Sequence, residues 1–273
     1  MLWGLAFVAT RIGLDELSPP QLAAARFMIA AVPVLFVARP AAPWPALVAV
    51  GLTLFAGQFL FQFFGIAAGM PPGLASVVVQ SQALFTIALA TLFLRERPTR
   101  RQLGGLLLGL AGLATIGLTV GGDLSAGALA LTLGSPLSFA VGNLLLKRLP
   151  VAAPFALVAW LSLVPPIPAL AVATVLDGPH AVLNATALSW RGVVAAVYLG
   201  AAATTLAYAI WGALLRRYPT ALVAPFALLV PFVAAVSSAL VFGERFGGLR
   251  LAGMALVLCG LAIIVPPSRR KAA

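Results

Sequence analysis

The dominant feature of the sequence is a succession of long apolar runs, separated by short stretches rich in Pro, Gly and Arg. A helix needs ~20 mainly apolar residues to cross the hydrocarbon core of a bilayer, and most of the runs reach that length. Strands of a membrane barrel instead alternate polar and apolar residues over ~10 positions, a pattern that these continuous runs lack. We therefore predict an all-α integral membrane protein.

The composition supports this fold class. Hydrophobic residues make up 62% of the chain and charged residues 8%, whereas an average soluble domain has about 25% charged residues. The net charge is +11, but the basic residues form short clusters between apolar runs, as in the loops of membrane proteins. This pattern differs from the basic patch of a nucleic-acid-binding protein. The predicted partner is therefore the lipid bilayer and not a nucleic acid.

Loop signals divide the chain into ten predicted transmembrane helices. They cover residues 1–17, 20–38, 45–68, 71–94, 101–120, 125–147, 151–176, 190–214, 219–242 and 249–266. The first segment meets Arg11 after only ten residues, which is short for a crossing. Either this helix is truncated at its inner end or the natural start lies upstream, and the short apolar stretch favours an upstream start.

The charged residues predict the orientation. With the N-terminus in the cytoplasm, most basic residues fall in inner loops and the tail: Arg39, Arg95, Arg97, Arg100, Arg101, Lys147, Arg148, Arg216, Arg217, Arg269, Arg270 and Lys271. Most acids fall outside: Asp15, Glu16, Asp123, Asp177 and Glu244. By the positive-inside rule both termini are cytoplasmic, which requires an even number of crossings. We expect a multi-pass protein of a bacterial-type inner (plasma) membrane.

An internal repeat relates residues 71–116 to residues 219–264, with an offset of 148 and no gap. Pro71 aligns with Pro219, Glu96-Arg97 with Glu244-Arg245, and Gly105 with Gly253. We predict a first five-helix repeat at residues 1–122, a second at 123–268 and a basic cytoplasmic tail at 269–273. Because five is odd, the second repeat is inverted, an arrangement that secondary transporters use around a site near the bilayer midplane.

Arg26 is the first candidate for that site. Polar side chains deep in a bilayer are costly and usually face the protein interior or a cavity. The planar guanidinium of Arg26 suits a carboxylate, so it is predicted to bind an anionic or zwitterionic substrate. The alternatives are that it snorkels to the outer headgroups or pairs with Asp15 or Glu16.

Other polar residues share helix faces. Gln58 and Gln62 are four residues apart, as are Ser76 and Gln80, so each pair lies on one face. Gln82 and Thr86 lie on nearly the opposite face from Ser76 and Gln80. We expect only one of these two faces to line the cavity and prefer the face of Ser76 and Gln80, while the other holds helices together.

Three further features complete the candidate set. Thr204, Tyr208 and Trp211 form one stripe, which could be a cavity wall or a packing face. Asn143 is a lone amide that could bind substrate or another helix. Pro225 and Pro231 free backbone carbonyls and permit bending, so they are candidate hinges. The predicted substrate-binding residues are thus Arg26, Gln58, Gln62, Ser76, Gln80, Asn143, Tyr208 and Trp211.

Several motifs are absent from the sequence. No acid lies near the middle of a predicted span, and His180 lies in an outer loop, so no obvious proton relay is present and protons stay open as the coupling ion. Cys259 is the only cysteine and no metal cluster is indicated. The sequence has no G-x-S-x-G with a His partner in a span, no H-E-x-x-H and no P-loop. We predict no enzyme activity, no cofactor and no metal.

Particular motifs resemble the EamA family of the drug/metabolite transporter superfamily, over essentially the whole chain. They are Trp3-Gly4, Pro19-Pro20 followed by Ala-Ala-Arg26-Phe27, the run from Gly69 to Ser76 and the two Glu-Arg loops. Gly57-Gln58-Phe59, Gln80-Ser81-Gln82 and Tyr208-Ala-Ile-Trp211-Gly212 are similar in particular to bacterial exporters of O-acetylserine and cysteine. The resemblance implies ten helices in two inverted halves, a central cavity and export. Ala6 departs from the Asn that many relatives carry there.

Together these features predict a secondary transporter, a monomer or homodimer, that exports an amino-acid-like metabolite of the cysteine, O-acetylserine and threonine class by alternating access. One alternative is an exporter of another small metabolite, such as a sugar or lipid-linked compound, or of a drug-like compound. Another is a membrane protein that does not transport, either a scaffold or a membrane-embedded enzyme.

Overall fold

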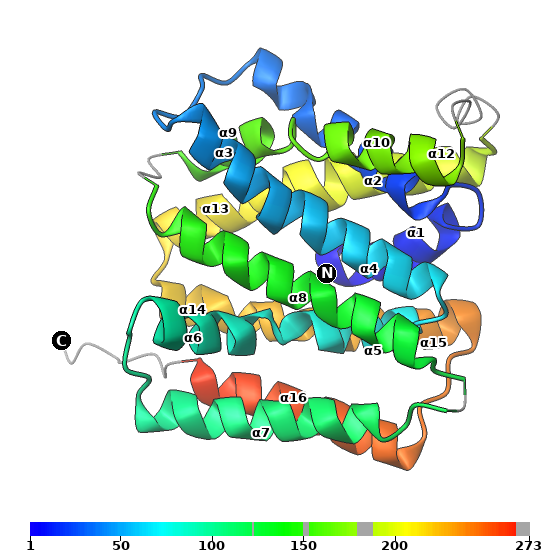
Figure 1. The fold of residues 1–273 in the computed structure, drawn as a ribbon, viewed down its shortest axis with the longest axis vertical. Helices are drawn as coiled ribbons and strands as arrows, with labels where there is room; N and C mark the ends of the chain where they lie inside the picture. The colour runs from blue at the N-terminus through cyan, green and yellow to red at the C-terminus, as the bar shows by residue number, and fades with distance from the viewer. Residues whose placement is uncertain (122, 150–152, 179–187, 266–273) are drawn as a thin grey trace.

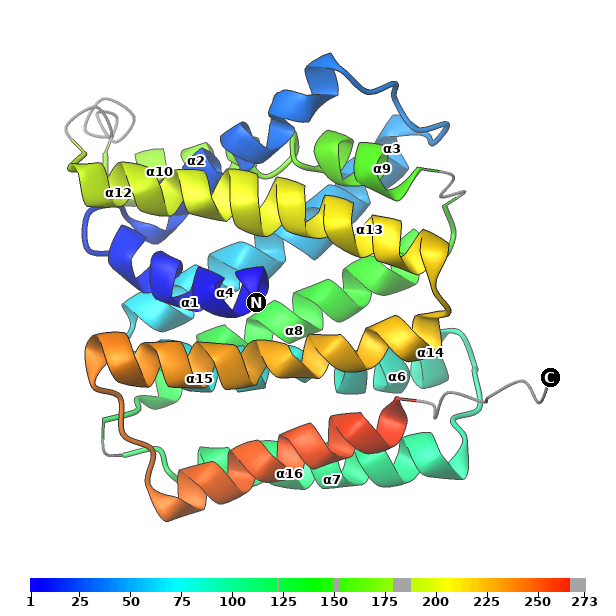
Figure 2. The ribbon, with the colours of Figure 1, turned by 180° about the vertical axis from the view of Figure 1, so that it is seen from behind.

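The computed structural model describes residues 1–121, 123–149, 153–178 and 188–265, and their regular structure is helical throughout. His180 and the predicted tail at 269–273 lie outside the described residues. Figure 1 shows the helices side by side, with α7 (Arg100–Gly117) and α16 (Gly248–Ile264) together at one edge of the molecule. The view from behind shows the same pairing (Figure 2).

The first part of the chain contains broken helices as well as continuous ones. Its helices are α1 (Leu2–Gly13), α2 (Pro19–Ala31) with a 3-10 helix at Val32–Leu35, α3 (Trp44–Val50), a π-helical stretch at Gly51–Gly57, α4 (Gln58–Ala67), α5 (Pro72–Gln80) and α6 (Gln82–Phe93), followed by α7. Proline at the first helical position starts α2 and α5, where the missing N–H has no helical acceptor to lose.

The second part is interrupted in a similar way. Its helices are α8 (Ala126–Leu146), α9 (Pro154–Leu161), α10 (Pro166–Leu176), α12 (Trp190–Val197), a π-helical stretch at Tyr198–Leu206, α13 (Ala207–Arg217), α14 (Thr220–Val223), a 3-10 helix at Ala224–Leu228 and α15 (Leu229–Phe242), followed by α16. The break between α9 and α10 coincides with Pro165 and Pro166, whose rings and missing N–H groups interrupt a helix.

Each predicted segment overlaps helical structure, and six continuous stretches among the described residues have the length and hydropathy to cross a membrane. These are Trp44–Ala67, Pro72–Phe93, Ala126–Leu146, Pro154–Leu176, Trp190–Arg217 and Pro225–Phe242. Shorter apolar helices lie at Leu2–Gly13, Pro19–Leu35 and Gly248–Ile264. Large apolar side chains such as Leu107 and Leu240 remain exposed, as a lipid-facing surface requires. The chain is therefore a multi-pass membrane protein.

Two groups of buried apolar residues form the interior. Phe27, Phe55 and Phe63 belong to the first, which joins α2, α4, α9 and the π-helical stretch at Tyr198–Leu206. Leu74 and Ile116 belong to the second, which joins α5, α7, α15 and α16. Trp3 packs against both groups. The candidate site lies between them.

Candidate functional site

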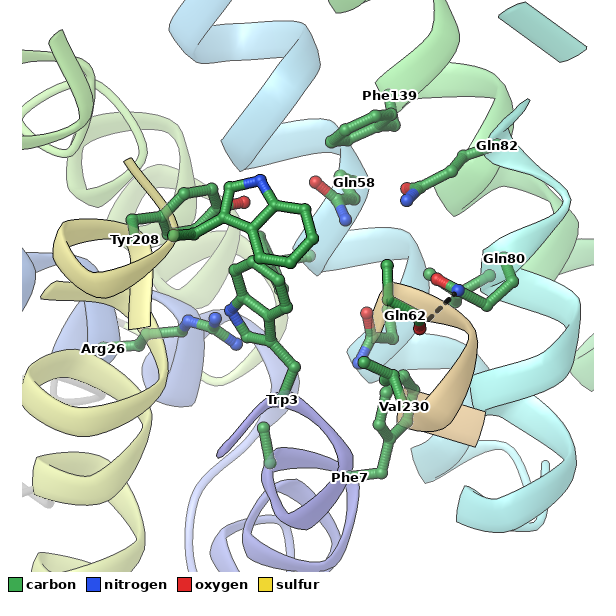
Figure 3. Close-up of a pocket in the computed structure, with 15 residues that line it drawn as sticks. Trp3, Phe7, Arg26, Gln58, Gln62, Gln80, Gln82, Phe139, Tyr208 and Val230 are labelled. Atoms are coloured by element: carbon green, nitrogen blue, oxygen red, sulfur yellow. Dashed lines mark hydrogen bonds between the residues drawn. The ribbon is translucent and has the colours of Figure 1, made fainter. Parts of the chain in front are cut away.

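A cavity of about 250 Å³ lies at the centre of the helix array. Its walls come from α1, α2, α4, α5, α6, α8, α13 and the region around Ala227 and Val230. The lining residues are Trp3, Ala6, Phe7, Arg26, Gln58, Phe59, Gln62, Val79, Gln80, Gln82, Phe139, Tyr208, Trp211, Ala227 and Val230. Six of the predicted binding residues are therefore brought together here: Arg26, Gln58, Gln62, Gln80, Tyr208 and Trp211. The first five of these are labelled in Figure 3.

Arg26 is a buried cation on this cavity, with only 2% of its surface exposed. Its Nε donates a hydrogen bond to Thr204 Oγ1 at 3.0 Å, and its Cζ lies 3.8 Å from the centroid of the Phe59 ring. It forms no ion pair within the part of the chain that the structure describes. The guanidinium therefore has unused donors and no counter-charge, which a ligand carboxylate would supply.

The two alternative predictions for Arg26 do not fit these contacts. A side chain that is 2% exposed does not reach the headgroups. Asp15 instead pairs with Arg11 one turn away on α1, and Glu16 accepts hydrogen bonds from the backbone and side chain of Ser189. Both acids are thus engaged elsewhere, and Arg26 faces the cavity (Figure 3).

The glutamines bring unpaired polar atoms to the cavity. Gln58 and Gln62 follow one face of α4 and are almost completely buried. The Oε1 atoms of Gln58 and Gln82 are buried without a hydrogen-bond partner among the described residues. Unpaired buried polar atoms are costly, and a ligand that donates hydrogen bonds, such as an ammonium group, would satisfy them.

Gln80 and Gln82 both line the cavity, so the prediction that only one of their two helix faces would do so is wrong. The reason is a break at Ser81, where α5 ends and α6 begins. The Ser81 hydroxyl donates to the Val78 carbonyl oxygen at 2.6 Å, a local bond that competes with helical pairing. The break turns α6 relative to α5 and brings Gln82 to the cavity.

Gln80 also connects α5 to the proline-containing helix opposite. Its Nε2 donates to the carbonyl oxygen of Ala227 at 3.2 Å, drawn as the dashed line in Figure 3. Residue 231 is proline, so Ala227 lacks the N–H that a continuous α-helix would offer its carbonyl. Pro225 lies in the 3-10 helix at Ala224–Leu228 and Pro231 in the first turn of α15, so the predicted hinge positions fall on an irregular part of this helix.

Aromatic rings form the remaining walls. The ring centroids of Trp3 and Tyr208 are 5.3 Å apart, as are those of Trp3 and Trp211. The indole N–H of Trp3 donates to the Ala203 carbonyl oxygen at 2.9 Å, which fixes the ring. The sequence prediction missed Trp3, Phe7, Phe59 and Phe139. A signal existed for the first two, since Trp3 and Phe7 are four residues apart on one face of α1.

Ser76 and Asn143 lie outside the cavity lining, which corrects the expectation that they face it. Ser76 is fully buried and its hydroxyl donates to the Gly73 carbonyl oxygen one turn earlier at 2.6 Å. Asn143 Nδ2 donates to Thr86 Oγ1 at 3.4 Å, which joins α8 to α6. Both side chains therefore satisfy helix backbone or a neighbouring helix. Among the described residues no group of three or more His, Cys, Asp or Glu is placed to hold a metal ion.

Comparison with known proteins gives a consistent result. A family model described as the EamA-like transporter family matches residues 1–118 and 126–265. A probable amino-acid metabolite efflux pump of Salmonella typhimurium is 41% identical over 97% of this chain and 91% of its own length, and one of Escherichia coli K12 is 40% identical over the same shares. A probable terminal-alkyne amino-acid exporter of Streptantibioticus cattleyicolor is 28% identical over 96% of this chain and 89% of its own length.

A solved structure also shares the fold. It superposes with a TM-score of 0.65 at 20% sequence identity, over 96% of this chain and 92% of the other. At this identity the likeness concerns the fold alone.

Proposed function

The chain belongs to the EamA-like transporter family, and from this premise we propose that it exports a small amino-acid-like metabolite of the cysteine, O-acetylserine and threonine class. The family confirms the resemblance seen in the sequence motifs and makes the protein a transporter rather than an enzyme. The names of the two relatives at 40% and 41% identity favour an amino-acid metabolite as the substrate.

The proposal rests on the buried guanidinium of Arg26 in the central cavity, which forms no ion pair among the described residues. A buried cation without a counter-charge is unfavourable until an anion arrives, so Arg26 favours a ligand with a carboxylate. The buried Oε1 of Gln58 supplies an acceptor for the ammonium group of the same ligand. Gln62, Gln80, Tyr208 and Trp211 complete the wall around it.

The size of the cavity also favours a small substrate. Sites for drug-sized ligands measure about 300–1,000 Å³, and this cavity has about 250 Å³. Its buried guanidinium and four glutamine amides suit a small zwitterionic metabolite better than an apolar dye. This favours the amino-acid class over the alternative of a drug-like substrate.

We further propose ten crossings in two inverted five-helix halves. The two π-helical stretches, at residues 51–57 and 198–206, align with the repeat offset of 148. The break at Ser81 aligns with Leu229, where the 3-10 helix meets α15. Such equivalent interruptions support a common five-helix unit, and broken helices near the midplane are typical of transporters built from inverted repeats.

The pairing of α7 with α16 supports the same two-fold relation. A Cβ atom on Gly105 would lie 2.5 Å from the Gly260 carbonyl oxygen, and one on Gly112 would lie 2.7 Å from the Gly253 carbonyl oxygen. Under the offset Gly105 is equivalent to Gly253 and Gly112 to Gly260, so the two contacts exchange with each other. Rocking of the two halves about the axis of this two-fold relation would expose Arg26 to each side of the membrane in turn.

The proposed setting is a bacterial-type inner membrane, with both termini in the cytoplasm. Tags in the loops at Glu96 and Glu244 test this topology and the inversion together. The proposal requires the two tags to report from opposite faces of the membrane, and tags on the same face contradict it.

Transport itself is tested in liposomes that contain the purified protein. Labelled cysteine, O-acetylserine or threonine should exchange against the same unlabelled amino acid, and the methyl esters, which lack the carboxylate, should not compete. Arg26→Ala should lower exchange at least tenfold, which corresponds to about 1.4 kcal/mol. Arg11→Ala is the matched control, because Arg11 is exposed and paired with Asp15. Exchange equal to that of empty liposomes for every amino acid contradicts the substrate class, and repeating the assay with an imposed pH gradient tests proton coupling.

A further inference from the structure

Glu244 contacts the start of α5 from the loop between α15 and α16. Its Oε2 accepts a hydrogen bond from the Gly73 N–H at 3.1 Å. A Cβ atom on Gly73 would lie 2.7 Å from this oxygen and 3.0 Å from the Ala235 Cα on α15. The absence of a side chain at residue 73 therefore lets the carboxyl group and α15 approach the backbone of α5 together.

The second oxygen of the same carboxyl group lies in different surroundings. Glu244 Oε1 is buried without a hydrogen bond among the described residues, and Glu244 takes part in none of the ion pairs in that part of the chain. Arg250 is the cation that faces it from α16, but the Arg250 guanidinium donates to both oxygens of Asp123 at 2.7 and 3.0 Å. The Arg250 charge is thus committed to another acid.

Among the described residues, Arg250 is the only charged group that acts on the Glu244 carboxylate. The sequences of α5 and α15, which pack around it, contain no ionisable residue, and Arg245 beside it is exposed. Burial raises the pKa of Glu244 to about 7, against a smaller opposing effect of the Gly73 N–H and the Arg250 charge. Near neutral pH this carboxyl group therefore exchanges between its neutral and charged forms.

Helix α5 links this carboxyl group to the candidate substrate cavity. Residues Pro72 to Val79 are all buried, so α5 is enclosed along its length. Glu244 holds its first turn, and at its last residue Gln80 reaches Ala227 beside the cavity. Displacement of the first turn of α5 would therefore be transmitted along nine residues to the site.

Glu96, the repeat counterpart of Glu244, has different surroundings. It is exposed and forms a surface ion pair with Lys147, at 2.9 and 3.1 Å. Two acids that occupy equivalent places in the sequence thus differ in burial and in pairing. Only Glu244 has the geometry in which gain or loss of a proton changes how it docks.

We propose that Glu244 is a proton-binding latch of the transport cycle: the protonated side chain docks on α5 and closes this end of the path, and loss of the proton releases it. The claim that docking closes the transport path rests on the proposed function, whereas the pH-dependent docking of Glu244 on α5 does not. In the predicted topology this end faces outwards, so a proton from outside would favour return of the emptied carrier to the state closed on the outer side.

The direction of the pH dependence of docking follows from the burial of the Glu244 carboxyl group. A neutral carboxyl group tolerates the buried position, whereas a charged one gains hydration on leaving it. The docked pKa lies above the ordinary value of 4.5, so docking binds the proton more tightly. Proton binding to Glu244 therefore stabilises the docked state fully below about pH 4.5, and this stabilisation is lost as the pH rises through about 7.

The test uses a cysteine reporter on α5. Ser76→Cys, in a Cys259→Ala background, places a thiol at a fully buried position one turn after Gly73. The rate of its alkylation by N-ethylmaleimide is measured in liposomes without substrate, from about pH 5.5 to 8.5, with and without E244Q. Because the thiol is the same, the alkylation rate with Glu244 divided by the rate with E244Q isolates the effect of Glu244 at each pH.

The expected ratio is near one at acidic pH and rises severalfold above about pH 7, because E244Q imitates the protonated latch. E96Q should leave the pH profile of the reporter unchanged. Gly73→Ala, which forces the carboxyl group away from α5, should give fast alkylation at every pH. A ratio that stays constant over the whole range overturns the proposal.

Exchange of labelled amino acids by the same variants separates this proposal from the proposed function. E244Q should remove the pH dependence of exchange between about pH 6 and 8. If alkylation titrates but no amino acid is exchanged, the latch stands and the substrate class is wrong. If exchange is observed with the same pH profile in the parent and in E244Q, the latch is wrong and the substrate class stands.

Discussion

The side-chain amide of Gln80 donates to the main-chain carbonyl of Ala227, at the position where Pro231 removes the α-helical donor. Gln80→Leu removes this interhelical hydrogen bond and leaves the carbonyl with only the backbone N–H that follows the 3-10 helix. Hydrogen bonds between membrane helices contribute about 0.6 kcal/mol on average and up to about 1.7, so we expect a loss of stability of that size. Thermal unfolding of the purified protein in detergent measures it.

A double-mutant cycle makes this prediction specific. In a Pro231→Ala background the Ala227 carbonyl regains an N–H four residues later, so Gln80→Leu should cost less there than in the parent. Equal costs in the two backgrounds would mean that the amide of Gln80 does not compensate for the proline.

Arg26→Met should stabilise the substrate-free protein against unfolding while abolishing amino-acid exchange. The substitution removes a buried charge that has one hydrogen bond to Thr204 and no ion pair among the described residues. The Thr204 hydroxyl remains paired, because it also donates to the Leu199 carbonyl oxygen. Apolar replacement of buried ionic groups often stabilises by about 1–4 kcal/mol, and each kcal/mol raises Tm by about 2–4 °C in a chain of this size.

The comparison with Arg26→Ala separates charge from packing, because alanine also leaves a void beside Phe59. Arg26→Met should therefore unfold at a higher temperature than both Arg26→Ala and the parent. A Tm of Arg26→Met below that of the parent would show that the cation–π contact with Phe59 outweighs the cost of burying the charge.

Gly105→Ala should destabilise the pairing of α7 with α16, whereas Gly104→Ala should not. A Cβ on Gly105 would lie 2.5 Å from the Gly260 carbonyl oxygen, a backbone atom that moves only if the helices separate. A Cβ on Gly104 meets nothing within 4 Å, and alanine is favoured over glycine in a helix by roughly 1 kcal/mol. The two neighbouring variants should shift Tm in opposite directions, and equal shifts contradict close backbone contact at Gly105.

The fold class and much of the site could be predicted because their causes are local in the sequence. Apolar runs between clusters of Arg and Pro indicate membrane helices, and Arg26 and Gln58 are unusual in such runs. The 3.6-residue period then places Gln62 beside Gln58. These arguments need no knowledge of how distant helices pack.

The missed features depend on tertiary structure. The break at Ser81 has neither Pro nor Gly at the residue itself, so the sequence suggested one continuous face for Ser76 and Gln80. Phe59 and Phe139 resemble any lipid-facing aromatic residue in an apolar run. Ser76 was selected by its helix face, but its hydroxyl bonds to the backbone of its own helix, as serine hydroxyls in helices commonly do.

Asp123→Asn should lower the pH at which Glu244 is released from α5. The Arg250 guanidinium holds the pKa of the exposed Asp123 carboxyl below its ordinary value, and this ion pair weakens the effect of the Arg250 charge on Glu244. Without the Asp123 charge, the field of Arg250 acts more fully on the Glu244 carboxylate, which stabilises its charged form and lowers its pKa from about 7. Docking is then lost at a lower pH, and a shift of one unit corresponds to about 1.4 kcal/mol.

The alkylation profile of the Ser76→Cys reporter measures this shift, and Asp177→Asn is the matched control, because Asp177 is an acid of another loop and accepts a hydrogen bond from Ser18. Asp123→Asn should lower the midpoint and Asp177→Asn should leave it in place. A midpoint that is unchanged in Asp123→Asn would show that the Arg250 charge does not reach Glu244. A midpoint that rises would mean that Arg250 acts on α5 by a route other than the Glu244 carboxylate. An Arg250 charge without its Asp123 partner can only favour the ionised form of Glu244.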